Sequence, residues 1–156
     1  MSSYSFGAGK SESYYGKLTK KSWTAFGCSY LFGIIGWSDI SWKFNEYAYI
    51  TGKEYMDAQS KNQVSDWKIE MPKPEDIVIF YGTFNRPLRG MSIDFTLGQV
   101  SADAAFELSR KIMGNDWNNF YNSQLIEENA RAELRTMKCD YEAIGMKYEE
   151  AKSLLE

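Results

Sequence analysis

The stretch that decides the fold expected from the sequence is SQLIEENARAELRTMKCDYEAIGMKYEEAKSLLE, residues 123–156. Its apolar residues follow one another at alternating intervals of four and three, the spacing of one face of a long α-helix. Ser123 is suited to cap the first turn, and Glu127 and Glu128 suit the positive end of a helix. The apolar seam consists of Ala130, Leu134, Met137, Tyr141, Ile144, Tyr148, Ala151 and Leu155.

The length of this predicted helix sets a constraint. At about 1.5 Å per residue it would span roughly 50 Å, whereas a compact chain of this size is about 40 Å across. The helix must therefore break, most simply at Gly145, or project beyond the body of the protein. Tyr141 and Tyr148 are too bulky for a simple two-stranded coiled coil. We expect the first half to pack within the chain and the second half to contact a partner, including a second copy of the chain.

Strand patterns dominate the residues before this helix. The clearest runs from Met91 to Leu97, where apolar and polar residues alternate with the period of a half-buried strand. Residues 67–71 alternate in the same way, and residues 77–81 form a continuous apolar run typical of a central strand. The loop at residues 82–90, which joins residues 77–81 to residues 91–97, predicts an antiparallel hairpin.

Two aromatic-rich segments, residues 18–32 and 40–50, are also expected to be strands. In the second the alternation slips near Glu46, which predicts a bulge. Residues 22–38 are 17 consecutive uncharged positions, close to the minimum length of a membrane span. Their glycines and hydroxyl side chains favour a buried β-hairpin, so we expect no membrane association.

The spacing becomes helical after Gly98. Ser101 is placed to cap a helix, and Gly114 is placed to end it. The apolar positions Ala105, Leu108 and Ile112 form one stripe along it.

The predicted fold class is α+β. We expect an antiparallel β-sheet of four to six strands over about residues 17–98, packed against C-terminal helices at about 101–113 and 123–156. Residues 1–16, rich in Ser, Gly and Tyr, are expected to form an irregular arm. Residues 17–156 are expected to form one domain, because a chain of this length holds one core.

The charge balance argues against a protein that recruits polyanions with its whole surface. The net charge is −3 and the pI is about 5.2. Residues 1–100 carry 11 basic and 10 acidic side chains, whereas residues 101–156 carry 7 and 11. The C-terminal part is therefore the acidic one.

Metal and cysteine chemistry are not expected. The chain has no histidine, and its two cysteines, Cys28 and Cys139, are far apart in the sequence. A zinc site is therefore not predicted. Cys28 lies among aromatic residues and is interpreted as core packing. Only two cysteines, far apart in the sequence, and the absence of a secretory signal favour a cytoplasmic location.

Catalytic motifs are weak. Gly7-Ala-Gly-Lys-Ser11 resembles the end of a phosphate-binding loop, but it lacks the first glycine and the preceding strand. Without histidine, acid–base chemistry would need paired carboxylates, and nothing in the sequence pairs Asp39, Glu46 or Asp94. We therefore expect no enzyme and no cofactor.

Two patches have the composition of protein-binding anchors, since arginine and aromatic residues dominate binding energy at interfaces. One is a loop at the tip of the predicted hairpin, and the other is the linker between the two helices. Tyr148 and Leu155, which lie late in the apolar seam, are added to these two patches. The candidate protein-binding residues are therefore Phe84, Arg86, Leu88, Arg89, Trp117, Phe120, Tyr121, Tyr148 and Leu155.

An alternative site lies near the N-terminus, where the first 21 residues carry a net charge of +3. Lysines follow phosphates and aromatic rings stack on bases, so this combination suits a single-stranded nucleic acid. Its candidate residues are Lys10, Tyr14, Tyr15, Lys17, Lys20 and Lys21.

The favoured function is therefore a small non-enzymatic protein that binds another protein, as inhibitors, immunity proteins, adaptors and modulators encoded by phages or mobile elements do. A nucleic-acid-binding protein that uses the N-terminal arm is the alternative. A self-assembling structural protein of the kind found in virions, or a homo-oligomer formed through the C-terminal helix, is a further one.

Overall fold

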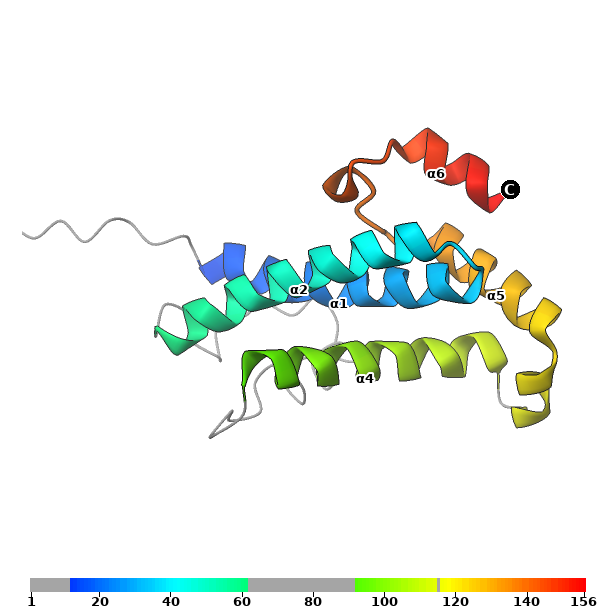
Figure 1. The fold of residues 1–156 in the computed structure, drawn as a ribbon, viewed down its shortest axis with the longest axis horizontal. Helices are drawn as coiled ribbons and strands as arrows, with labels where there is room; N and C mark the ends of the chain where they lie inside the picture. The colour runs from blue at the N-terminus through cyan, green and yellow to red at the C-terminus, as the bar shows by residue number, and fades with distance from the viewer. Residues whose placement is uncertain (1–11, 62–91, 115) are drawn as a thin grey trace, which may run out of the picture.

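The computed structural model describes residues 12–61, 92–114 and 116–156. Within these ranges every regular element is a helix, without strand or sheet (Figure 1). The α+β prediction is therefore wrong. The elements are the α-helices α1 (Glu12–Ile34), α2 (Ser38–Ser60), α4 (Ile93–Met113), α5 (Ser123–Thr136) and α6 (Tyr148–Leu155), with the 3₁₀ helices η2 (Trp117–Tyr121) and η3 (Glu142–Ile144).

Helix α1 is the central element, because it packs against α2, α4 and α5. Leu18, Phe26, Leu31 and Phe32 are all buried along it. A helix buried on several sides shows no single apolar stripe, so its sequence cannot be told from a buried strand by periodicity alone. This is why residues 18–32 were predicted as a strand. The helix begins inside the expected N-terminal arm, and residues 1–11 lie outside the described part.

Helix α2 replaces the second predicted strand. Its buried residues recur at helical intervals, and the supposed bulge near Glu46 is the point where this helical period departs from strict alternation. The apolar pattern of residues 40–50 therefore has the period of a helix and not the two-residue period of a strand. The buried stripe includes Ile40, Phe44, Ala48, Thr51 and Tyr55.

Helices α1 and α2 form an antiparallel hairpin that turns at Gly36, whose φ is 81°. Ser41 Oγ donates a hydrogen bond to the carbonyl of Ser29 at 2.7 Å, and Ser22 Oγ donates to the carbonyl of Ala48 at 2.7 Å. These bonds let buried hydroxyl groups lie between the helices without loss of hydrogen bonding.

Helix α4 overturns the clearest strand prediction. Ser92 caps it, because its Oγ accepts a hydrogen bond from the Phe95 amide at 3.2 Å. The alternating residues therefore span a cap and a first turn, and Ser101, the expected cap, lies inside the helix. The expected end at Gly114 is confirmed, with φ 66° at the C-cap. The predicted strands at residues 67–71 and 77–81 lie outside the described residues.

The predicted helix over residues 123–156 is not continuous. Helix α5 ends at Thr136, and Met137 adopts an extended conformation. A second change of direction follows at Gly145, with φ 75°. Five residues of the apolar seam are nevertheless buried within the chain, so they are not free to form a zipper between copies. They are Ala130, Leu134, Tyr141, Ala151 and Leu155.

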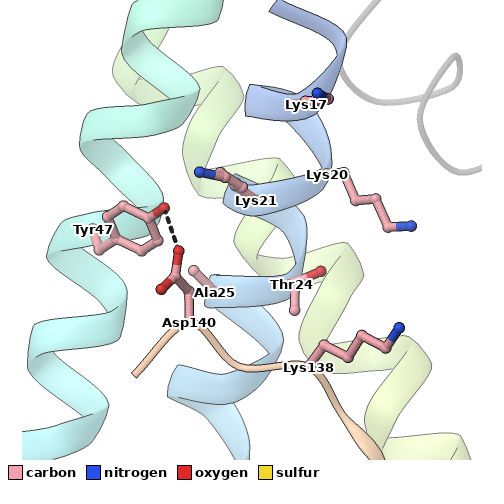
Figure 2. Close-up of a pocket in the computed structure, with 8 residues that line it drawn as sticks. All are labelled: Lys17, Lys20, Lys21, Thr24, Ala25, Tyr47, Lys138 and Asp140. Atoms are coloured by element: carbon pink, nitrogen blue, oxygen red, sulfur yellow. Dashed lines mark hydrogen bonds between the residues drawn. The ribbon is translucent and has the colours of Figure 1, made fainter. Parts of the chain in front are cut away.

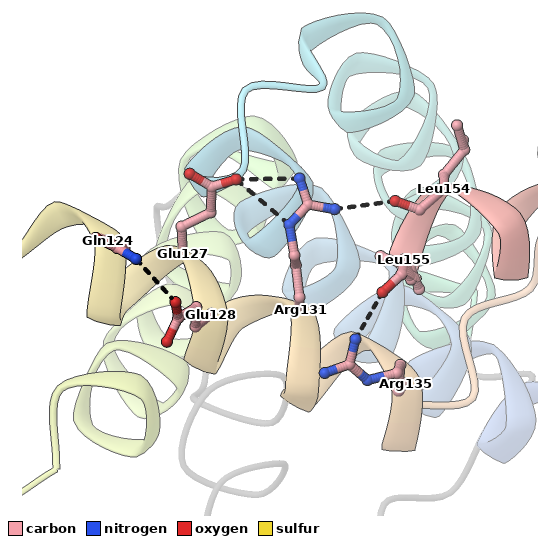
Figure 3. Close-up of polar contacts among 7 residues, drawn as sticks. All are labelled: Gln124, Glu127, Glu128, Arg131, Arg135, Leu154 and Leu155. Atoms are coloured by element: carbon pink, nitrogen blue, oxygen red, sulfur yellow. Dashed lines mark hydrogen bonds and ion pairs between the residues drawn. The ribbon is translucent and has the colours of Figure 1, made fainter.

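Two arginines of α5 hold the end of α6 (Figure 3). Arg131 donates to the carbonyl of Leu154 at 2.9 Å, and Arg135 donates to the carbonyl of Leu155 at 2.6 Å. These carbonyls have no partner inside their own helix, and a cation suits the negative end of the helix dipole. Glu127 pairs with Arg131 at 3.0 Å and so orients it.

The segment between α5 and α6 is tied to the core in two ways. Tyr141 packs edge-on against Phe44, with ring centroids 5.8 Å apart, and also against Phe32. Cys28 and Cys139 form a disulfide bond with their Cα atoms 6.1 Å apart. Cys28 is buried as expected, but it is not a free thiol. Because disulfides persist chiefly in oxidising compartments, this bond removes the cysteine-based argument for a cytoplasmic location.

None of the helices in the described part of the chain has the combination of length and apolar character that crossing a membrane requires. This includes α1, which contains most of the uncharged run at residues 22–38.

Candidate functional site

A cleft of about 380 Å³ lies between α1, α2 and the segment after α5 (Figure 2). Its volume falls within the range of small-ligand pockets in proteins. We call it the lysine cleft, because half of its lining residues are lysines. The lining consists of Lys17, Lys20, Lys21, Thr24, Ala25, Tyr47, Lys138 and Asp140.

Two elements supply the four lysines. Lys17, Lys20 and Lys21 follow one another at intervals of three and one, so Lys20 and Lys21 project about 100° apart around α1, with Lys17 between their directions. Lys138 comes from the extended segment that follows α5. In Figure 2, Lys20 and Lys138 extend toward the same side of α1, whereas Lys21 lies on the side of Tyr47. All four side chains are exposed, so their ammonium groups remain hydrated and accessible.

The only carboxylate in the lining, that of Asp140, accepts hydrogen bonds from groups other than the lysines. Asp140 Oδ2 accepts a hydrogen bond from the Tyr47 hydroxyl at 3.2 Å, and Oδ1 accepts from the Ala143 amide at 3.2 Å. None of the ion pairs found among the described residues includes a lysine of the cleft. The lining therefore carries an excess of positive charge that Asp140 does not cancel by direct pairing.

Tyr47 acts as a fixed hydrogen-bond donor in this site. Burial, followed by the nearby charge of Asp140 and the hydrogen bond to it, raises the pKa of Tyr47 to about 12. All three effects disfavour the phenolate. At neutral pH the hydroxyl therefore keeps its proton and continues to hold Asp140.

The arrangement suits an anion. Ammonium groups bind carboxylates and phosphates as mobile point charges, and the Thr24 hydroxyl at the same cleft is a further hydrogen-bonding group. Across the described residues, no group of three or more histidine, cysteine, aspartate or glutamate side chains is placed to hold a metal ion.

The predicted protein-binding residues are dispersed. Phe84, Arg86, Leu88 and Arg89 lie outside the described residues. Trp117 and Phe120 belong to η2, but the positions of their side chains also lie outside what the structure describes.

The remaining three residues of that prediction differ in exposure. Tyr121 is 88% exposed and Tyr148 is 63% exposed, whereas Leu155 is buried at 4%. Tyr148 and Leu155 line a second cleft of about 280 Å³ between α5 and α6. Leu155 therefore packs inside the chain and presents little surface to a partner.

Only three of the six residues predicted to bind nucleic acid lie together at the cleft. Lys17, Lys20 and Lys21 line the cleft, and the Tyr14 hydroxyl donates to Glu54 at 2.8 Å. Lys10 and the side chain of Tyr15 lie outside the described residues.

The sequence patterns did not indicate five residues of the lining, namely Thr24, Ala25, Tyr47, Lys138 and Asp140. Thr24 stands three residues after Lys21, so a helical interpretation of this segment would have placed it beside the lysines. Lys138 and Asp140 give no such signal, because their position depends on contacts between residues far apart in the sequence.

Comparison with known proteins gives no relative: no family model, curated protein or solved structure matches this chain.

Proposed function

We propose that this protein is a non-enzymatic binding protein and that its lysine cleft receives an acidic segment of another protein. One observation carries the proposal: four lysines from two separate elements line a single cleft, and none of them has an ion-pair partner among the described residues. Unpaired like charges repel one another, so an incoming row of carboxylates stabilises the arrangement.

An acidic peptide fits the site better than a nucleic acid does. Proteins that bind single strands combine a basic groove with exposed rings on which bases stack. The cleft is lined by one aromatic residue, Tyr47, which is partly buried and bonded to Asp140. The chain as a whole is acidic, with a net charge of −3, which disfavours a long polyanion.

The expected affinity follows from the exposure of the lysines. Exposed ion pairs contribute about 0.2–1 kcal/mol each, so four of them give at most about 4 kcal/mol. That free energy corresponds to a Kd of about 1 mM for a short peptide that makes no other contact. A folded partner would add contacts around the cleft and bind more tightly.

The test uses the peptide octaglutamate and a twelve-residue oligothymidylate, each titrated into the full chain and followed by NMR chemical shifts. We expect octaglutamate to shift the amides of α1 and of residues 138–140, with binding weakened at 300 mM salt relative to 20 mM. Lys20→Gln/Lys138→Gln should weaken binding by about fivefold or more. The matched control is Lys53→Gln/Lys152→Gln, which removes the same charge from exposed positions outside the lysine cleft.

Three outcomes would overturn the proposal. Octaglutamate shifts that are absent, or equally reduced in the control variant, would show that the cleft is not the binding site. Tighter binding of the oligothymidylate, lost in Lys20→Gln/Lys138→Gln, would favour a nucleic-acid ligand instead.

A further inference from the structure

The disulfide bond joins two segments that line the lysine cleft. Cys139 stands between two lining residues, Lys138 and Asp140. Its partner, Cys28, follows the lining residue Thr24 by about one turn of α1. The bond therefore joins the wall formed by residues 138–140 to the helix that carries the other three lysines.

Other contacts hold this wall at different points. On its C-terminal side, Tyr141 packs against Phe44, and Asp140 is held to α2 by Tyr47. On its N-terminal side, Met137 lies over Gly27 so closely that a Cβ there would meet the Met137 methyl at 3.1 Å. The disulfide is the one covalent tie in the described residues between this wall and α1.

We infer that the disulfide is a positioning element of the binding site: it holds Lys138 on the side of α1 from which Lys20 projects, so the cleft is complete only in the oxidised protein (Figure 2). This inference rests on the proposed function for its ligand, an acidic peptide. The bond itself does not touch the ligand. It acts through Lys138, the neighbour of Cys139 in the sequence.

A dithiol reduces the Cys28–Cys139 bond by thiol–disulfide exchange. One thiolate of the dithiol attacks a protein sulfur, its second thiol resolves the mixed disulfide, and the dithiol leaves as a cyclic disulfide. Cys28 and Cys139 each gain one electron and one proton. Both residues are buried, so the dithiol reaches the bond only when residues 137–141 move away from α1.

Hydrogen exchange separates this inference from the proposed function. The oxidised protein is compared with the same protein in dithiothreitol and with Cys28→Ser/Cys139→Ser. Without the bond we expect amides of residues 137–144 to exchange at least tenfold faster than in the oxidised protein, and at least tenfold faster than those of residues 100–112 in α4, whose exchange reports global unfolding. Unchanged exchange in residues 137–144 would overturn the inference, whether or not octaglutamate binds.

A double-mutant cycle tests the role of Lys138. In the oxidised protein Lys138→Gln should weaken octaglutamate binding about two- to fivefold. In Cys28→Ser/Cys139→Ser, binding should already be weaker by a similar factor, and Lys138→Gln should then add almost nothing. Full additivity of the two changes would show that the bond does not position Lys138.

A second variant distinguishes a local effect on the cleft from unfolding of the whole protein. If the serine variant loses its helical circular dichroism, Cys28→Ala/Cys139→Val keeps the buried sites apolar. If this variant also unfolds, the bond supports the whole fold and not the cleft in particular, and the inference fails. Absence of octaglutamate binding to the oxidised protein would instead refute the proposed function, while the exchange result would still decide whether the bond positions the wall.

Discussion

Gly52 of α2 lies where side chains of α1 and α4 approach the α2 backbone closely. A Cβ at this position would lie 2.5 Å from Leu97 Cδ2 and 2.7 Å from Ser22 Oγ. Those atoms belong to α4 and α1, so glycine is required here by interhelical packing and not by a turn. The sequence pattern gave no sign of this, because a glycine within an aromatic-rich segment suggested a turn between strands.

Gly52→Ala is therefore expected to destabilise the fold by about 1–3 kcal/mol through overpacking. Gly98→Ala is the matched control, because nothing lies within 4 Å of a Cβ built there and the residue is inside α4. That substitution should stabilise the protein by about 0.5–1 kcal/mol. Urea unfolding followed by circular dichroism measures both. Equal effects would contradict the close helix packing at Gly52.

Tyr47 gives the site a pH dependence. Its pKa is raised to about 12 in the folded protein, from an ordinary value of about 10. The stability that its neutral hydroxyl contributes is therefore fully present below pH 10 and is lost as the pH rises toward 12.

We expect Tyr47→Phe to reduce the free energy of unfolding by about 1 kcal/mol at pH 8, the usual worth of one hydrogen bond. The difference from the wild type should shrink between pH 10 and 12. Urea titrations at pH 8, 10 and 11.5 provide the measurement, with Tyr148→Phe as an exposed control. A difference that grows with pH would refute the role assigned to the hydroxyl.

At the scale of elements, α6 is a short helix that depends on α5. Eight residues are too few for a helix to be stable by itself in water. Its buried residues Ala151 and Leu155 face the chain, and its last carbonyls accept hydrogen bonds from Arg131 and Arg135. The two arginines therefore fix where α6 ends and how it lies on α5 (Figure 3).

Arg131→Gln/Arg135→Gln should release α6 while the bundle of α1, α2 and α4 stays folded. Amides of residues 151–155 are expected to exchange at least tenfold faster, because the removed bonds are partly buried and charge-assisted. Arg110→Gln is the control, since Arg110 is an exposed residue whose distance to Glu107 is 3.9 Å. Protection of α6 that survives the double substitution would show that apolar packing alone holds it.

At the scale of the whole molecule, the disulfide joins positions 111 residues apart and so links α1 to the C-terminal third. A bond that closes so long a loop restricts the unfolded chain strongly. It also links the core around Phe32 and Phe44 to the segment that carries Tyr141.

Cys28→Ser/Cys139→Ser is expected to lower the free energy of unfolding by about 3–5 kcal/mol. Urea unfolding with and without dithiothreitol gives the measurement, because the reductant should affect only the wild type. Peptide mass spectrometry without reduction identifies the bonded pair directly. Stability that is the same in the variant and the oxidised wild type would contradict a structural role for the bond.

Local sequence patterns correctly predicted the helical end at Gly114 and the amphipathic character of residues 123–136. These features depend on neighbours along the chain, where a cap or an apolar stripe is visible in the order of residues. The local patterns also placed Lys17, Lys20 and Lys21 in one basic group. Short-range spacing was enough for each of these features.

Tertiary contacts decide that residues 18–32, 40–50 and 93–97, which the sequence pattern assigned to strands, are helical. Helix α1 is buried on several sides, and α4 begins with a cap whose residues alternate by chance in polarity. Tertiary contacts also decide the break after Thr136, where Tyr141 and Cys139 turn back into the core. The lysine cleft likewise depends on tertiary contacts. Lys138 meets the lysines of α1 because packing, and not sequence spacing, brings distant segments together.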